Sequence, residues 1–324
     1  MLGFVIQRFL QAAMVMVVMS VIVFLGVHAI GNPVDIVIPP DATEEIRAAT
    51  IARLGLDRPL WEQYAIFASN LVQGDFGRSF VYAIPVLDLI AGRLPATLEL
   101  VLISVVSATV LGVSLGVYAG YRPDGWPAKV IMATSVLGFS VPSFWVGLIL
   151  ILTFAVSLGW LPAGGRGETV EMLGVNWSFV TLDGLSHIVL PAINLALFKL
   201  AMMIRLARAG TREIMLTDTV KFARAAGISE SVILRRHVLK LISIPIITVF
   251  GLELGSTLAF AVVTETIFSW PGVGKLIIDS IAVLDRPVMV AYLILIAMLF
   301  VTINFVVDLI FGLLDPRIRS RGAA

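Results

Sequence analysis

The sequence predicts an all-α integral membrane protein with six transmembrane helices, and two observations support this prediction. The chain of 324 residues is 59% hydrophobic and 14% charged, with a mean hydropathy of +1.00, which is too apolar for a single soluble core. Six runs reach roughly 20 residues with few or no charges, the length that crosses a hydrocarbon layer of about 30 Å. The chain has no cysteine, which excludes disulfides and thiolate metal sites, and its net charge of +1 argues against nucleic acid as a partner.

The first expected span runs from about Phe9 to Ile30, directly after Arg8. It is longer than a typical signal-peptide core and lacks a convincing small-residue cleavage site, so we expect residues 1–30 to form a retained anchor helix. The other five expected spans cover residues 100–121, 130–158, 188–204, 241–268 and 288–307. An even number of spans places both termini on the same side of the bilayer.

Basic side chains indicate which side that is, because Lys and Arg near the ends of spans are retained in the cytoplasm. They gather in the connection after the fourth span, in the connection after the second span and in the C-terminal tail. The residues are Arg205, Arg208, Arg212, Lys221, Arg224, Arg235, Arg236 and Lys240; Arg122 and Lys129; and Arg317, Arg319 and Arg321. All three groups fall on the side of Arg8, so we expect both termini in the cytoplasm.

The long segment between the first two spans, residues 31–96, is predicted to lie outside and to contain two or three short amphipathic helices. Asp41 or Thr43 can cap a first helix that Gly55 closes. Pro59 suits the first position of a second helix, whose apolar residues recur at helical spacing until Gly74. These helices are either a lid packed on the spans or a docking surface for another protein. Residues 97–312 then form the membrane core, and residues 313–324 a cytoplasmic tail.

Small residues repeat at four-residue intervals within the spans, at Gly112, Gly116 and Gly120 and again at Gly251 and Gly255. Such faces allow two helices to approach closely where lipid supplies no hydrophobic drive, so we expect helix contacts there.

Three prolines, Pro142, Pro191 and Pro245, would kink or start helices, which is tolerated where the broken helix lines protein or a water-filled cavity.

Four ionisable residues lie at membrane depth: Lys199, Glu253, Glu265 and Asp308. Each costs on the order of 2.5 to 3.5 kcal/mol at a helix centre. Lys199 and Asp308 are expected to snorkel to the cytoplasmic face, and Glu265 lies near the outer end of its span. Glu253 sits near the middle of its span, so it must be protonated, paired or wetted by a cavity. It is a candidate for the translocation path or for an interhelical hydrogen bond.

No catalytic constellation is evident. The phosphate-loop lookalike PGVGK, residues 271–275, lacks the first glycine at the required spacing and the Ser or Thr after Lys. His28, His187 and His237 are scattered and have no second ligand at metal spacing. The sequence therefore indicates a membrane protein that offers a passage but has no ATP-binding motif of its own, and not an enzyme.

The basic segment KFARAAGISESVILRRH, residues 221–237, lies between two apolar runs and divides at Gly227. We expect a short helix from Asp218 to Ala226 and a second from Ser229 to about Lys240, because glycine is a common stop signal and serine can cap the next helix. A small-residue surface of this kind can be approached closely by another protein. The alternative is a basic amphipathic helix on anionic lipid, which leaves the turn and the alanines unexplained.

Residues 222–237, FARAAGISESVILRRH, resemble the cytoplasmic EAA loop of ATP-binding-cassette (ABC) importer permeases, in the variant found in the oligopeptide, dipeptide and nickel permeases. The similarity continues through ETIFSWPGVGKLIIDSI, residues 265–281, and ends with DPRIR, residues 315–319. Upstream, other stretches look like signatures of that family in the same order: LGLDRPLWEQY, GDFGRSF, VPSFWVG, LPAGG and HIVLPAINLAL. The resemblance covers nearly the whole chain.

The resemblance implies a type I ABC importer permease fold in the inner membrane of a bacterium. The partners would be a second homologous permease, two cytoplasmic ABC ATPases and an extracytoplasmic solute-binding protein. ATP would be bound by the ATPases, so this chain is expected to hold no cofactor. Residues 208–240 would be the coupling loop, which moves when the ATPases close and drives alternating access.

Seven residues of that loop take roles by resemblance. Ala223, Ala226 and Gly227 would make the docking surface for an ATPase. Four charged residues would orient it: Arg224, Glu230, Arg235 and Arg236.

The chain departs from the family pattern at several positions. Phe222 replaces the glutamate that names the EAA motif, and Ala226 stands where the peptide branch commonly has lysine. GNP at residues 31–33 replaces a usual GDP, and Glu253 stands where the family often has glutamine. The last substitution makes a passage for a cationic or polar solute conceivable.

By resemblance to the family, we expect the transported solute to be a dipeptide or short peptide. Nickel chelates, glutathione-like thiols and opine-like compounds are lower-ranked alternatives. Two functions of other classes are alternatives. A proton-coupled secondary transporter would use Glu253, Glu265 or Asp308 as a relay and need no ATPase. A membrane scaffold or sensor would use the outer helices to bind a protein and move no solute.

Overall fold

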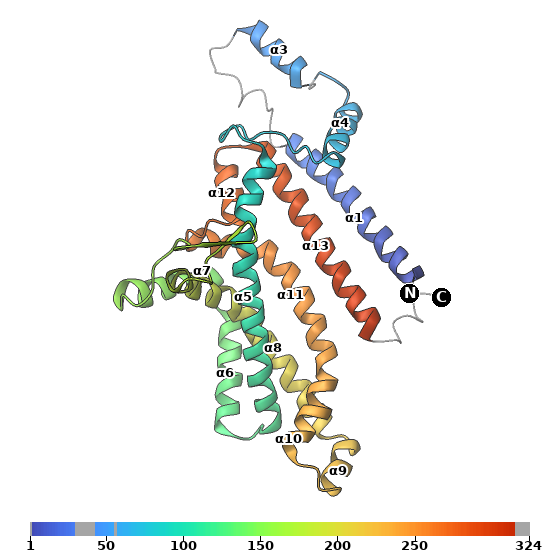
Figure 1. The fold of residues 1–324 in the computed structure, drawn as a ribbon, viewed down its shortest axis with the longest axis vertical. Coiled ribbons are helices and arrows are strands. Elements are labelled where there is room, and N and C mark those ends of the chain that lie inside the picture. The colour runs from blue at the N-terminus through green and yellow to red at the C-terminus, as the bar shows by residue number, and fades with distance from the viewer. Residues whose placement is uncertain (1, 30–42, 55–56, 315–324) are drawn as a thin grey trace.

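The computed structural model describes residues 2–29, 43–54 and 57–314 as a helical bundle with one short β-hairpin (Figure 1). The elements are, in chain order, α1 (Leu2–Ala29), α3 (Glu44–Leu54), α4 (Leu60–Val72), α5 (Val86–Tyr121), α6 (Trp126–Ser140), α7 (Ser143–Leu150), the π-helix η1 (Ile151–Ser157), β1 (Val170–Met172), β2 (Val175–Trp177), α8 (Leu182–Met215), α9 (Asp218–Ala225), α10 (Glu230–Ile233), the π-helix η2 (Leu234–Val238), α11 (Leu239–Ile267), α12 (Val273–Ala282) and α13 (Arg286–Leu314).

Among the described residues, five helical stretches are long and apolar enough to cross a membrane: Val5–Gly26, Val86–Tyr121, Leu182–Met215, Glu230–Ile267 and Arg286–Leu309. A sixth candidate is bent, because α6 and the α7–η1 segment pass the same test together but meet at an angle of 108°. The all-α membrane fold predicted from composition is therefore confirmed, with the third span as its irregular member.

The sequence predicts one span over residues 130–158, and the structure divides it at Pro142. This proline is the N-cap of α7, and the residue before it, Val141, is extended with φ −97° and ψ 131°. A residue preceding proline is pushed out of the helical region by the proline ring, so α6 ends there and a new helix starts in another direction. In Figure 1, α7 leaves the bundle sideways while α6 runs along α5.

Two spans are longer than hydropathy predicts. α5 begins at Val86 and α8 continues to Met215, beyond the apolar runs 100–121 and 188–204. Charged residues end a hydropathy window, but they do not end a helix, because Arg, Lys and Glu are good helix formers outside the hydrocarbon. The last eleven residues of the segment expected outside, residues 31–96, therefore belong to α5. Three of the basic residues after the fourth expected span, Arg205, Arg208 and Arg212, lie on α8 itself.

The repeated glycines mark the close helix contacts that the sequence predicts. A Cβ added at Gly112 would lie 2.5 Å from the Cβ of Met203, and one at Gly116 would lie 2.5 Å from the carbonyl oxygen of Ile204, both on α8. The face of Gly251 on α11 is filled in the same way by Val307 of α13. Backbones approach this closely only where a side chain is missing, so the prediction of packing faces is confirmed.

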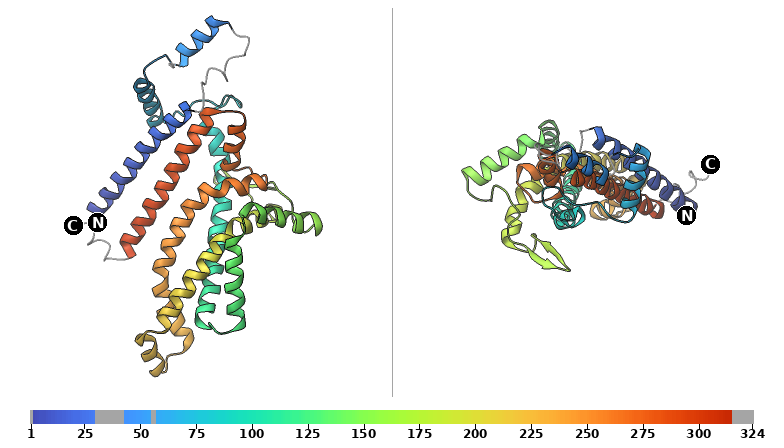
Figure 2. Two further views of the ribbon diagram at one scale, coloured as in Figure 1. Left: turned by 180° about the vertical axis from the view of Figure 1, so that it is seen from behind. Right: turned by 90° about the horizontal axis from the view of Figure 1, so that it is seen from above.

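The helices α3 and α4 lie at one end of the molecule together with α12, and α9 and α10 lie at the other (Figures 1 and 2). The first residues of α1 and the last residues of α13 lie toward the end that carries α9. α4 packs on α1, where the ring of Tyr64 meets that of Phe24 at 5.4 Å between centroids. Pro59 precedes α4 as its N-cap. Asp41, Gly55, the GNP stretch and the tail residues Arg317, Arg319 and Arg321 lie outside the described residues.

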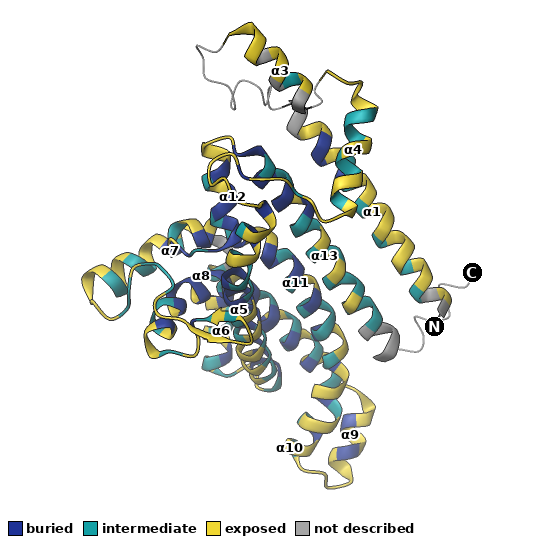
Figure 3. Cartoon of the chain, turned by 45° about the horizontal axis from the view of Figure 1, so that its top comes forward, coloured by how far each residue is buried: buried dark blue, intermediate teal, exposed yellow. Residues whose placement is uncertain are grey.

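The core lies where α5, α8 and α11 meet, and α1 contributes little to it (Figure 3). At the end of this core nearest α12, Trp270 is fully buried and donates its indole N–H to the carbonyl of Ala96 at 2.8 Å. Beside it the carboxylate of Glu265 accepts hydrogen bonds from the hydroxyl of Thr97 at 2.6 Å and from the backbone N–H of Lys275 at 2.9 Å. Glu265 thus caps the N-terminus of α12 and does not face a passage.

That cap explains the phosphate-loop lookalike at residues 271–275. The space that a Cβ at Gly272 would need is filled by the carboxylate of Glu265, and a Cβ added at Gly274 would lie 2.9 Å from an oxygen of the same group. Because these positions have no side chain, the carboxylate of Glu265 reaches the N-terminus of α12, which carries a partial positive charge. In a phosphate loop the ligand phosphate would occupy this place.

Candidate functional site

The first candidate site is the turn between α9 and α10, at the end of the molecule opposite α3 and α4. Gly227 has φ +77°, its N–H donates to the carbonyl of Arg224 at 3.0 Å, and the N–H of Ile228 donates to the carbonyl of Ala223 at 3.0 Å. These two bonds form a Schellman motif, whose left-handed position favours glycine. No atom lies within 4 Å of the position a Gly227 Cβ would take, so this point of the turn is open to a partner.

An ion pair joins the helices on either side of the turn. The guanidinium of Arg224 donates to the carboxylate of Glu230, with Nε 2.6 Å from Oε1 and Nη2 3.3 Å from Oε2. The hydrogen bond to Glu230 raises the pKa of Arg224 above its ordinary value, so the guanidinium stays protonated. Both side chains are partly exposed, so the pair connects α9 with α10 but contributes little to the stability of the fold.

The seven residues assigned to this loop divide into two environments. Ala223 is 4% exposed and packs in a small core with Val220 and Ile233. The exposed members are Ala226, Gly227, Arg224, Arg235 and Arg236, and Glu230 is half-buried. Ala223 therefore packs in the interface between α9 and α10. A partner protein would contact the other six residues, which lie on the surface. Their role in docking stays a prediction.

The second helix of the loop is continuous with the fifth span. The sequence predicts a helix from Ser229 to Lys240 and a separate span from Leu241, whereas α10, η2 and α11 form one helical rod over Glu230–Ile267. Residues 234–238 wind as a π-helix and carry both arginines. A force on the turn would be transmitted along this rod to Glu253.

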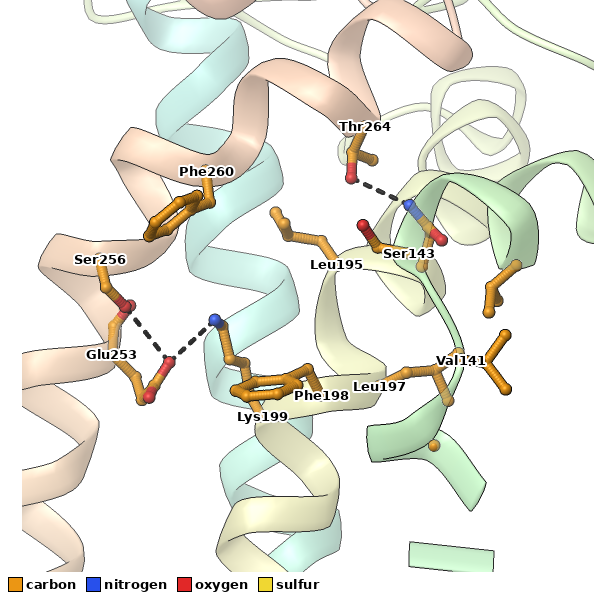
Figure 4. Close-up of a pocket in the computed structure, with 13 residues that line it drawn as sticks. Val141, Ser143, Leu195, Leu197, Phe198, Lys199, Glu253, Ser256, Phe260 and Thr264 are labelled. Carbon is orange, nitrogen blue, oxygen red and sulfur yellow. Dashed lines mark hydrogen bonds and ion pairs between the residues drawn. The ribbon is translucent and has the colours of Figure 1, made fainter. Parts of the chain in front are cut away.

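The second candidate site is a cavity of about 550 Å³ bordered by α6, α7, α8 and α11 (Figure 4). Its lining is mostly apolar with a few convergent polar groups, the usual composition of a small-molecule site. The lining residues are Gly138, Val141, Ser143, Val146, Asn194, Leu195, Leu197, Phe198, Lys199, Glu253, Ser256, Phe260 and Thr264.

The charged centre of this cavity is an ion pair between α8 and α11. The ammonium of Lys199 lies 3.0 Å from Oε2 of Glu253, and the two side chains are only 11% and 13% exposed. The hydroxyl of Ser256 lies within 3.3 Å of the same carboxylate oxygen. The sequence leaves three states for Glu253: protonated, paired or wetted by a cavity. In the structure Glu253 is paired with Lys199 and lines a cavity.

Lys199 corrects a sequence expectation, because it does not snorkel to the cytoplasmic face. α8 continues for roughly four turns beyond it, which leaves Lys199 in the middle of the helix facing the cavity. Hydropathy missed this because the apolar run ends at Ile204 while the helix does not. The sequence does indicate that an ionisable residue inside a span needs a partner, but it does not indicate which of the buried carboxylates pairs with Lys199.

Asp308 pairs instead with Arg8 on α1, at 3.1 Å. This contact lies at the end of the bundle where α1 begins, away from the cavity. Among the described residues, no group of three or more His, Asp or Glu side chains is placed to hold a metal ion.

Two family models match this chain and together cover nearly all of it. Residues 112–320 match the binding-protein-dependent transport system inner membrane component, and residues 1–101 match the N-terminal model of the same transport system membrane component. The chain belongs to this family of importer permeases.

Relatives and a solved structure agree with that assignment. The permease is 37% identical over 322 residues to the glutathione transport system permease protein GsiC of Escherichia coli strain K12, with 99% of this chain and 100% of that protein covered. GsiC of Shigella flexneri serotype 5b shows the same identity and coverage. An inward-facing structure of the MetNI methionine ABC transporter matches with a TM-score of 0.53 at 17% identity, over 71% of this chain and 97% of that chain, which shows the fold.

The permease is therefore a multi-pass inner membrane subunit of an ABC importer with the type I fold, and not an enzyme. Membership in the family implies a partner permease, ATPase subunits and a binding protein. Neither the proton-coupled carrier nor the scaffold gains support from the comparisons.

Proposed function

We propose that this permease imports glutathione or similar short peptides, delivered by an extracytoplasmic binding protein, into the bacterial cytoplasm. The observation that supports the proposal most is the 37% sequence identity, over 322 residues, to permeases named for glutathione transport. The cavity beside α11 supports it, because its Lys199–Glu253 pair suits a polar solute that carries both charges.

The exposed turn at Gly227 is proposed to dock into a cleft of an ABC ATPase, with Arg235 and Arg236 beside it. In this arrangement the end of the molecule that carries α9 faces the cytoplasm, together with both termini. α3 and α4 then face outward, where the binding protein arrives. Figure 1 places the α5–α6 connection and the α9–α10 turn at the same end of the molecule, and Arg122, Arg224, Arg235 and Arg236 lie in or beside these two segments, which agrees with this orientation.

Transport would proceed by alternating access. Closure of two ATPases on ATP moves the α9–α10 turns of this permease and of its partner permease. Because α10, η2 and α11 form one rod, that movement tilts the α11 wall of the cavity relative to α8. The cavity then opens alternately toward the binding protein and toward the cytoplasm, and the chain performs no covalent chemistry.

The test is co-purification of the tagged permease with the transport subunits expressed beside it, combined with ATP-driven glutathione uptake in vesicles. Gly227→Arg and Gly227→Ala share the strain of a non-glycine residue at φ +77°, but only arginine fills the open space above the turn. We expect Gly227→Arg to lose the ATPases and uptake, and Gly227→Ala to keep most of both. Equal ATPase recovery with the wild type and Gly227→Arg would remove the docking role.

A further inference from the structure

The Lys199–Glu253 pair is the central polar feature of the cavity, and its position is energetically unusual. Both side chains are nearly buried at mid-helix, where an unpaired charge is costly. A pair that served only to join α8 and α11 could be replaced by apolar side chains of similar size. Here the pair instead borders a cavity of about 550 Å³, where its charged atoms are accessible to a solute (Figure 4).

A second group in the cavity wall lacks a hydrogen-bond partner. Asn194 on α8 is 3% exposed, and its Nδ2 donates to the hydroxyl of Thr264 on α11 at 2.9 Å. Its Oδ1 is buried and has no partner among the described residues. Buried carbonyl oxygens are usually satisfied, so this acceptor marks a place where a donor from outside the chain fits.

We infer that the cavity is a binding site for a solute carrying an ammonium and a carboxylate on one carbon, an α-amino-acid head group. The solute ammonium binds Glu253 and the solute carboxylate binds Lys199. The unpartnered Oδ1 of Asn194 accepts from an N–H further along the solute. This assignment rests on the proposed function and narrows it, because the γ-glutamyl end of glutathione is such a head group, whereas an ordinary peptide carries its two charges at opposite ends.

The separation of the charges supports this solute class. Lys199 Nζ and Glu253 Oε2 are 3.0 Å apart, so the site presents its opposite charges side by side. The two charges of an α-amino-acid head group are likewise adjacent, and the head group can lie antiparallel to the pair. Each buried charge then keeps an opposite partner throughout, and the net charge of the site stays zero.

A solute with only one of the two charges fits less well. Binding a lone carboxylate to Lys199 would draw the ammonium from Glu253 and leave a net negative charge beside two side chains that are only 11% and 13% exposed. Blocking the solute ammonium should therefore weaken passage far more than the lost contact alone would. The pair acts as a selectivity element against half-charged analogues.

The experiment compares uptake of glutathione with that of N-acetylglutathione, whose ammonium is blocked, by the complete transporter in membrane vesicles. The test variant is Lys199→Gln with Glu253→Gln, which removes both charges and leaves neither one unpaired. The matched control is Lys275→Gln with Asp279→Asn, which neutralises an ion pair on α12 away from the cavity. Because the binding protein is the same throughout, any change in the ratio of the two uptake rates arises in the permease.

We expect wild type and the α12 control to favour glutathione by at least about tenfold, the loss typical for removal of a hydrogen bond to a charged group. The double-neutral variant should assemble and lose most of that preference. If it fails to assemble, Glu253→Asp keeps both charges but shifts one by a methylene, and a ratio equal to wild type in that variant overturns the inference. The inference is also overturned if the double-neutral variant keeps the wild-type preference for glutathione over N-acetylglutathione. In that case, uptake of glutathione would still support the proposed function. Wild-type vesicles that take up neither solute would instead contradict the proposed function.

Discussion

The guanidinium of Arg166, in the connection between η1 and β1, meets the carboxylate of Glu99 on α5 at 2.7 Å. The Glu99 side chain is fully buried and also accepts from the backbone N–H groups of Ser178 and Phe179, at 2.8 and 2.7 Å. One carboxylate therefore ties both ends of the hairpin region to the bundle. This contact holds the long connection between η1 and α8 against α5.

Replacing Glu99 with alanine should destabilise the permease by about 3–5 kcal/mol, the cost of leaving one partner of a buried pair uncompensated. The loss would appear as a lower midpoint of thermal unfolding in detergent and as faster proteolysis within residues 159–181. Glu171→Gln is the matched control, since Glu171 lies exposed on β1 of the same hairpin. An unchanged midpoint for Glu99→Ala would show that the hairpin is held by other contacts.

A methyl group added at Gly116 should disrupt the α5–α8 contact, because its Cβ would fall 2.5 Å from the backbone oxygen of Ile204. Backbone cannot move aside as a flexible side chain can, so Gly116→Ala is expected to reduce the yield of folded permease sharply. Gly92→Ala lies on the same helix with no atom within 4 Å of the new Cβ. That control should be neutral or stabilising by up to about 1 kcal/mol through helix propensity. Size-exclusion chromatography of both variants distinguishes them, and equal monodispersity would contradict the packing argument.

Thr97 joins α5 to the cap of α12, because its hydroxyl donates to Glu265 at 2.6 Å and accepts from the N–H of Val273 at 2.9 Å. Thr97→Val keeps the shape and removes both bonds inside the core, at a cost of about 1–3 kcal/mol for the groups left unsatisfied. Thr109→Val is the control, since the hydroxyl of Thr109 bonds only a carbonyl of its own helix, at 2.7 Å. The midpoint of thermal unfolding should fall more for Thr97→Val than for Thr109→Val. A similar small decrease in both variants would show that Thr97 does not stabilise the cap of α12.

The sequence predicts the membrane fold and the glycine contacts because these depend on patterns that are local in the chain. An apolar run must cross the bilayer, and a repeated glycine on a span must face a neighbour. The same reasoning divides the basic segment at Gly227, where the left-handed turn is found. It also marks Pro142 as a place where a helix kinks or starts, and α7 starts there after a change of direction. The same reasoning marks Pro191 and Pro245, which lie inside α8 and α11, where neither starts a helix.

The pairings between distant segments could not be predicted in this way. Lys199 and Glu253 are 54 positions apart, and Glu99 and Arg166 are 67 apart. Which carboxylate meets which cation depends on the rotation and crossing of whole helices, and one sequence alone does not determine these. Asn194 carries no signal at all in the sequence, because an unsatisfied amide oxygen is a property of three-dimensional packing.

The Arg224–Glu230 bridge offers a test that separates geometry from direct contact at the α9–α10 turn. Because both side chains are about two-fifths exposed, Arg224→Ala should cost less than about 1 kcal/mol of stability. It should nevertheless lower ATP-driven uptake severalfold, since the angle between the two helices is no longer fixed. Lys221→Ala, which removes an exposed pair within α9 alone, is the control and should transport at the wild-type rate.

Exchanging the two charges, Arg224→Glu with Glu230→Arg, restores a bridge across the turn but reverses the charge that each helix presents. If the bridge acts by holding α9 against α10, the exchanged variant should recover most of the uptake lost in Arg224→Ala. Recovery is the expected result, because the guanidinium and carboxylate are committed to one another at 2.6 Å and contact no other described residue by hydrogen bond. An exchanged variant as inactive as Arg224→Ala, with ATPases still bound, would assign Arg224 to the ATPase surface itself.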